Sequence, residues 1–156
     1  ELEKETNGVQ YVVYIEKEYP KEFSLEDYSL KIAEQNKIGK KGNDNGVLLY
    51  IAVNDKKYRW EVGYGVESTL NSPLLGRISR EHLAPNFQQG KYEKGVLEAV
   101  DITKRLLLNS NDADIIALKN PKNQQGVAGI FFLIELKDLG GREKLKGYNV
   151  ESLIQF

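Results

Sequence analysis

Residues 39–70 read GKKGNDNGVLLYIAVNDKKYRWEVGYGVESTL, two strand-like runs set between two glycine-rich loops. The first run, residues 47–53, is almost continuously apolar, as a strand buried on both faces must be. The second run, residues 58–62, alternates between apolar and charged side chains, which is typical of a strand with one buried face. Asn54 and Asp55 join the runs, and their short polar side chains favour a turn. The stretch therefore predicts an antiparallel β-hairpin.

Both glycine-rich loops should emerge at the same end of this hairpin, because the first loop precedes its first strand and the second loop follows its second. Asp44 lies in the first loop and Glu67 in the second. We therefore expect the two carboxylates to share one pocket, within reach of one cation or polar ligand. Glycines in the loops allow tight turns and a close approach of backbone to a ligand. The alternative interpretation is that these are ordinary turn residues.

Two motifs at the hairpin resemble the paired signature of the TPM domain, found in thylakoid-lumen proteins of plants and in exported bacterial proteins. They are NDNGVLL at residues 43–49 and EVGYGVE at residues 61–67. Further matching positions follow in the same order, at Pro85, at Phe87 and in the GKY sequence before the last helix. The resemblance extends over residues 1–108, so we expect a TPM-like domain there. Residues 109–156 show no evident resemblance and are expected to form a C-terminal extension that could pack on the same domain.

The resemblance to the TPM domain implies an acidic pocket that binds a divalent cation, usually calcium. Asp44 and Glu67 match the acidic positions of the family, and Asn45 adds an amide oxygen to the first loop. Asn71 occupies a place where the family usually has aspartate. An amide there keeps one oxygen ligand but removes one charge, which should weaken calcium binding. The expected metal ligands are therefore Asp44, Glu67, Asn71 and Asn45, with Ca²⁺ as the cofactor.

The resemblance also implies two different functions. The first is a non-catalytic module, exported or membrane-associated, that binds calcium and engages a protein partner. That partner could be membrane-associated as well. Its compartment would be the periplasm, the cell envelope or a lumen, with a membrane anchor in the full-length protein. The alternative is a metal-assisted acid phosphatase acting on phosphate monoesters. No set of residues in the sequence can be assigned to phosphatase chemistry, which favours the non-catalytic module.

Composition and motifs exclude several other classes of function. The chain has 156 residues, with 22 lysines and arginines against 23 acidic residues, so no strong attraction to nucleic acid is expected. The absence of cysteine excludes thiol catalysis and disulfides. Gly63 and Gly65 follow a strand, but the third glycine of a dinucleotide fingerprint is missing, so nucleotide binding is not expected. The apolar run at residues 127–136 is too short to span a bilayer, which takes about 20 residues.

The rest of the chain predicts an α/β fold, a three-layer α/β/α sandwich whose central mixed sheet contains the hairpin and carries helices on both faces. Hydrophobic periodicity and capping residues place the other strands and helices. We expect a strand at residues 9–15, helices at 24–38, 73–83 and 92–108, and added strands at 114–118 and 129–136.

Three further residues carry specific expectations. Pro85 should end the helix at residues 73–83. His82, near the end of that helix, is interpreted as a solvated charge, with phosphate binding as the alternative. Tyr64 lies between two glycines and should be exposed at the mouth of the pocket.

Overall fold

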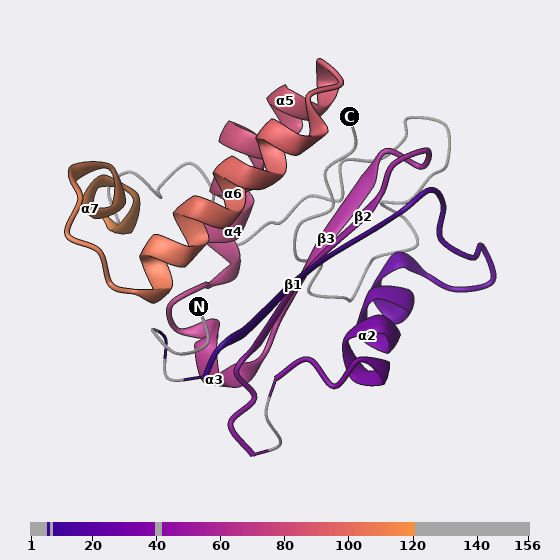
Figure 1. Ribbon diagram of the computed structural model, residues 1–156, viewed down its shortest axis with the longest axis horizontal. Coiled ribbons are helices and arrows are strands. Elements are labelled where there is room, and N and C mark those ends of the chain that lie inside the picture. The colour runs from indigo at the N-terminus through magenta and orange to yellow at the C-terminus, as the bar shows by residue number, and fades with distance from the viewer. Residues whose placement is uncertain (1–5, 7, 40–41, 121–156) are drawn as a thin grey trace. The chain divides into compact units, whose positions relative to one another are not determined.

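A computed structural model describes residues 6, 8–39 and 42–120 of the chain (Figure 1). The chain forms two compact units, Glu1–Ser68 and Thr69–Phe156. The first unit contains the sheet and the second contains a series of helices. Among the described residues, none of the helices combines the length and the apolar character needed to cross a lipid bilayer.

The sheet of the first unit is mixed and has three strands in the order β1-β2-β3. Strand β1 (Gln10–Glu16) runs parallel to β2 (Gly46–Ala52), and β3 (Lys57–Val62) pairs antiparallel with β2. The hairpin is therefore confirmed, and so is the predicted α/β fold class. All seven residues of β2 are buried, because β2 is the central strand and its run of apolar side chains fills both faces.

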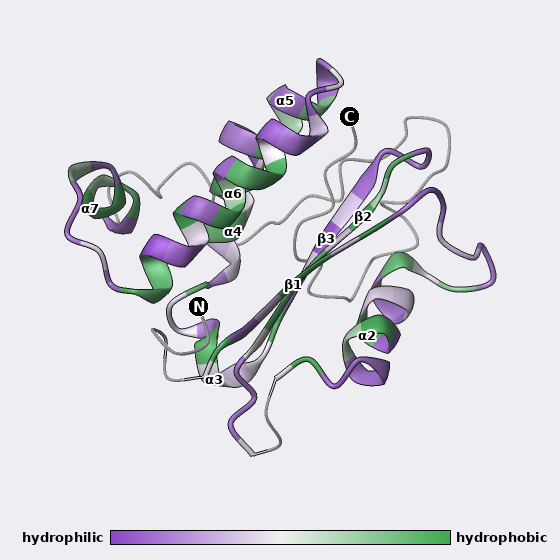
Figure 2. Cartoon of the chain, viewed as in Figure 1, coloured by the Kyte–Doolittle hydropathy of each residue, from purple (hydrophilic) through white to green (hydrophobic). Residues whose placement is uncertain are grey.

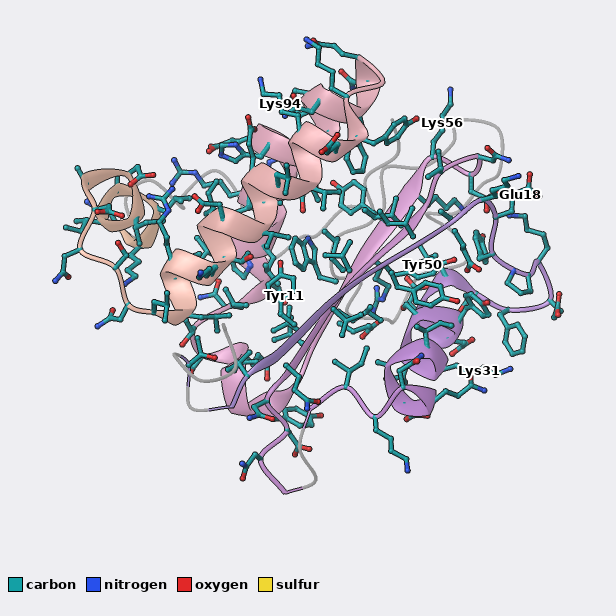
Figure 3. The ribbon with its side chains drawn as sticks, in the orientation of Figure 1. Tyr11, Glu18, Lys31, Tyr50, Lys56 and Lys94 are labelled. Carbon is teal, nitrogen blue, oxygen red and sulfur yellow. The ribbon has the colours of Figure 1, made fainter. Side chains whose placement is uncertain are left out.

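Helix α2 (Leu25–Gln35) lies on one face of this sheet. It begins at Ser24, whose hydroxyl accepts a hydrogen bond from the backbone N–H of Asp27 at 3.0 Å. Tyr50 of β2 faces this helix (Figure 3), and its ring centroid lies 5.8 Å from that of Tyr28 in an edge-to-face contact. The buried hydroxyl of Tyr50 donates a hydrogen bond to the carboxylate of Glu16. Burial and that carboxylate both raise the pKa of Tyr50.

The second unit begins with one continuous helical run. It consists of α4 (Ser72–Ile78), a π-helical turn η1 (Ser79–Leu83) and α5 (Ala84–Gln88). The prediction that Pro85 ends this helix was wrong. Proline lacks the N–H that an α-helix would use at this position, but the wider π turn lets the chain pass Pro85 and remain helical to Gln88.

Helix α6 (Tyr92–Leu107) packs against the π turn and α5. Hydrophobic and hydrophilic residues recur along α6 at helical spacing, as in an amphipathic helix with one buried face (Figure 2). The rings of Phe87 and Tyr92 lie 5.1 Å apart between centroids. A Cβ added at Gly95 would lie 2.9 Å from the ring of Phe87, so the glycine is what allows the two helices to approach this closely.

The strand predicted at residues 114–118 was also wrong, because these residues lie in helix α7 (Ala113–Lys119). Ile115 and Leu118, three residues apart, form its buried side. Arg105 of α6 holds the start of this helix through ion pairs with Asp112 and Asp114, at 3.3 and 2.8 Å. The second added strand, expected at residues 129–136, lies outside the described residues. The arrangement of helices on both faces of the sheet stays a prediction.

Candidate functional site

The two glycine-rich loops are joined by backbone hydrogen bonds beyond the end of the hairpin. The N–H of Gly63 donates to the carbonyl of Gly46, and the N–H of Gly65 donates to the carbonyl of Asp44, both at 2.9 Å. The second loop then forms a one-turn helix, α3 (Tyr64–Glu67), which the sequence did not predict. The loops therefore emerge at the same end of the hairpin, as expected.

Glycine is needed in the second loop because the first loop lies directly against it. A Cβ at Gly63 would lie 2.0 Å from the carbonyl oxygen of Asp44, and one at Gly65 would lie 2.1 Å from that of Asn43. Both distances are far below any real contact of a Cβ atom. Gly63 itself has φ −70° and ψ 151°, which any residue can adopt. Its role is thus to permit the approach of a neighbouring backbone and not to relieve strain.

A pocket of about 1050 Å³ lies at this end of the first unit. It is lined by residues of α2, of the first loop, of β2 and β3, and of the second loop. Asp44 and Glu67 both line it, so the structure brings the two predicted acids to one pocket. Tyr64 also lines it and is 85% exposed, in agreement with the sequence analysis. The other lining residues are Leu30, Ala33, Glu34, Lys37, Ile38, Gly39, Gly46, Leu48, Glu61, Val62 and Gly63.

Two further carboxylates line this pocket, Glu34 on α2 and Glu61 on β3, and sequence reasoning missed both. Glu61 is held by the hydroxyl of Ser29 at 2.6 Å and by the guanidinium of Arg59 at 2.5 Å. Within the described part of the chain, the carboxylates of Glu34, Asp44 and Glu67 form no hydrogen bond or ion pair.

The described lining of the pocket is therefore negatively charged. It carries the four carboxylates and the single ammonium group of Lys37. A ligand that enters this pocket meets a field that favours cations.

The two asparagines predicted as ligands have structural roles. Asn45 is buried, and its amide donates to the backbone carbonyl of Gly8 at 2.7 Å. Asn71 belongs to the second unit, where its side-chain oxygen accepts a hydrogen bond from the N–H of Leu74 at 3.0 Å and caps α4. Neither residue is among those that line the pocket. Their assignment as calcium ligands stays a prediction.

The pocket lacks the density of ligands that marks a tight metal site. No group of three or more histidine, cysteine, aspartate or glutamate side chains with the geometry to hold a metal ion occurs in residues 6, 8–39 and 42–120. Calcium takes six to eight oxygens, but backbone carbonyls, amides and water can supply several of them. Asp44 and Glu67 could supply two carboxylates to such a site.

His82 belongs to the π turn of the second unit and is not among the residues that line this pocket. Its Nδ1 lies 3.2 Å from a carboxylate oxygen of Glu98 on α6, and the amide of Asn86 donates to the same oxygen at 3.0 Å. Burial raises the pKa of Glu98, but the hydrogen bond from His82, the charge of Lys94 and the amide of Asn86 outweigh it and lower the pKa overall. His82 therefore ties two helices together and is not simply a solvated charge.

The chain is similar to a known family and to solved structures over about its first two thirds. A sequence profile described as the TPM domain matches residues 1–106. The solution structure of the N-terminal domain of a protein from P. gingivalis is 31% identical, with a TM-score of 0.61, over 70% of this chain and 71% of that one. The structure of the BA42 protein from Bizionia argentinensis is 18% identical, with a TM-score of 0.56, over 72% of this chain and 79% of that one. The second likeness concerns the fold alone.

Curated proteins with sequence similarity are adenine phosphoribosyltransferases. The enzyme of Francisella tularensis subsp. holarctica (strain FTNF002-00 / FTA) is 43% identical over 61 residues, which are 39% of this chain and 35% of that enzyme. The enzyme of Acetivibrio thermocellus is 60% identical over 30 residues, which are 19% of this chain and 18% of that enzyme. The chain thus spans about a third of the length of the Francisella enzyme and less than a fifth of the Acetivibrio enzyme.

Proposed function

The chain belongs to the TPM domain family, and from this premise we propose that it is a non-catalytic module that binds calcium in the pocket shared by Asp44 and Glu67 and engages a protein partner. The observation that carries the proposal is the pair of carboxylates that two hydrogen-bonded loops bring to one pocket, where neither forms an ion pair with any described residue. Two like charges at one site repel each other, and a divalent cation between them relieves this repulsion. An exported or membrane-associated location is part of the same proposal and is supported by family membership alone.

Calcium should bind weakly at this pocket. Since the described residues contain no group of three acidic side chains placed to hold one ion, the ion would take its remaining ligands from backbone carbonyls and water. Affinity in oxygen sites rises with the number of charged ligands. We expect the exposed loops to respond to calcium with changes at residues 43–46 and 63–67 and with little change elsewhere.

The test is a titration with CaCl₂ followed by amide NMR on the full chain. Asp44→Asn and Glu67→Gln each remove one charge and keep the shape of the side chain, so each should weaken binding on the order of tenfold. Glu93→Gln removes an exposed carboxylate of α6 that does not line the pocket, and it should leave calcium binding unchanged. Shifts that saturate equally in all four proteins would show that calcium binds elsewhere.

The alternative function, a metal-assisted acid phosphatase, predicts a different result in the same samples. Two carboxylates can hold a metal ion that activates a water molecule, and this arrangement would turn over p-nitrophenyl phosphate in the presence of calcium or magnesium. Turnover that is lost in Asp44→Asn and kept in Glu93→Gln would favour the phosphatase. The likeness to adenine phosphoribosyltransferases covers 35% of that enzyme at most and carries no proposal of transferase activity.

A further inference from the structure

One side of the pocket is formed by helix α2, and we call the α2 residues that line it the helical wall. This wall offers apolar surface that plays no part in binding a calcium ion. Leu30, Ala33 and Glu34 lie at helical spacing on α2, and all three line the pocket. Lys37, which follows just beyond the end of the helix, lines it too. Leu30 is 49% exposed there, although its helix buries Leu25 and Ile32 elsewhere. A half-exposed leucine at the rim of a concave site offers apolar surface that a ligand can cover.

The size of the pocket points to a larger occupant than an ion. A calcium ion reaches its ligands at about 2.3–2.6 Å, whereas sites for small molecules and peptide side chains enclose about 300–1,000 Å³. The volume of about 1050 Å³ lies at the upper end of the second class or slightly above it. Its apolar lining includes Ile38, Leu48 and Val62, and the ring of Tyr64 lies at the same pocket. An aliphatic side chain could therefore be seated beside the acidic loops.

The charge of the pocket decides what accompanies that aliphatic side chain. Glu34 on the helical wall and Asp44 and Glu67 on the loops are carboxylates without ion pairs in the described residues. An anionic or neutral apolar ligand would leave all three uncompensated. A ligand with ammonium or guanidinium groups next to the aliphatic side chain matches both parts of the pocket.

We propose that this pocket binds an extended peptide segment in which a leucine-sized aliphatic residue is flanked by lysine or arginine. The aliphatic side chain covers Leu30 and Tyr64, and the flanking cations face Glu34 and Glu67. From the proposed function this inference takes only the idea that a protein partner binds the chain. It adds the chemistry of the segment with which that partner binds. It does not depend on calcium.

The test uses an N-acetylated, C-amidated heptapeptide of sequence Gly-Ser-Lys-Leu-Lys-Ser-Gly, titrated into the full chain at low ionic strength with EDTA present. We expect saturable shifts at the pocket residues. Replacing the central leucine of the peptide by serine should weaken binding about tenfold, because the apolar contact is lost. Replacing both lysines by glutamate should abolish binding. Equal affinity for the leucine and serine peptides would overturn the proposal and leave only charge attraction.

Variants of the protein locate the binding surface. Leu30→Ser should weaken peptide binding about fivefold, whereas Leu97→Ser, at a leucine of α6 that is 60% exposed, should leave it unchanged. Glu34→Gln should weaken it about threefold at low salt, with Glu93→Gln as the matched control. If Leu30→Ser and Leu97→Ser bind the peptide equally, the assignment of this wall is wrong.

The two proposals fail separately. Calcium is titrated without peptide and the peptide is titrated without calcium, so each ligand has its own result. Peptide binding that depends on Leu30, in a protein whose amide spectrum does not respond to calcium, would overturn only the calcium site. Calcium binding that depends on Asp44, in a protein that does not bind the leucine peptide, would overturn only the peptide site.

Discussion

Gly63→Ala tests the joining of the two loops most directly. The backbone of Gly63 has φ −70° and ψ 151°, so alanine is allowed there without strain. The new Cβ atom would lie 2.0 Å from the carbonyl oxygen of Asp44 and 2.6 Å from its carbonyl carbon. Carbon and oxygen atoms in contact lie about 3.3–3.6 Å apart. The first loop would therefore have to move by on the order of 1 Å.

The cost of this movement has two parts. Adding a methylene to a closely packed site costs about 1–3 kcal/mol. Displacement of the Asp44 carbonyl also breaks the hydrogen bond that it accepts from Gly65, which contributes about 0.5–1.5 kcal/mol. We therefore expect Gly63→Ala to lower the free energy of unfolding by about 2–4 kcal/mol. Denaturation in urea measures this as a lower midpoint with an unchanged slope.

Gly42→Ala is the matched control in the same loop. A Cβ at Gly42 meets nothing within 4 Å, so its cost comes only from a φ of +90°, about 1–2 kcal/mol. Hydrogen exchange separates the two causes. The amide of Gly65 should exchange faster in Gly63→Ala and at the parent rate in Gly42→Ala. A Gly63→Ala protein within about 0.5 kcal/mol of the parent, with a protected Gly65 amide, would refute the reasoning.

Three further predictions concern other contacts. The folded-state pKa of Glu98 is lowered, so its carboxylate stabilises the protein at neutral pH and this contribution is lost as the pH falls through the lowered pKa. Glu98→Gln should therefore reduce stability at pH 7 and have little effect near pH 3, as urea denaturation at both pH values would show. Ser29→Ala removes a buried donor to Glu61 and should cost about 1–2 kcal/mol, measured in the same way. Asn71→Ala should cost about 1 kcal/mol through the lost cap, whereas Asn71→Asp keeps the cap; tighter calcium binding by Asn71→Asp would place this residue in the calcium site.

The sheet of the first unit followed from local signals in the sequence. Residues 47–62 contain an apolar run, a turn and an alternating run, and each of these is decided by neighbours in the chain. Residues 114–118 carry no such signal, because a short apolar run is compatible with a strand or a helix. The ion pairs of Arg105 with Asp112 and Asp114 help to fix the helix there, and they come from tertiary packing. The π turn that carries the helix past Pro85 likewise has no local signature.

The candidate site divides in the same way. Asp44 and Glu67 could be brought together from the sequence because the hairpin fixes where its loops emerge. Glu34 and Glu61 could not, since they reach the pocket only through the packing of α2 on the sheet. A signal for the helical wall was nevertheless present. Leu30 and Glu34, one turn apart, put an apolar and an acidic side chain on the same face of α2, whereas Leu25 and Ile32 of this helix are buried.

The glycines of the two motifs do not by themselves argue for a ligand. Gly63 and Gly65 are required because the backbones of Asn43 and Asp44 lie against them, and this packing would persist in a protein without any calcium. The evidence for a cation therefore rests on the carboxylates of Asp44 and Glu67. Asp44 has φ +45°, a conformation that asparagine also tolerates, so Asp44→Asn removes the charge and keeps the loop. A loss of calcium binding in this variant, with unchanged stability, would separate the ligand from the fold.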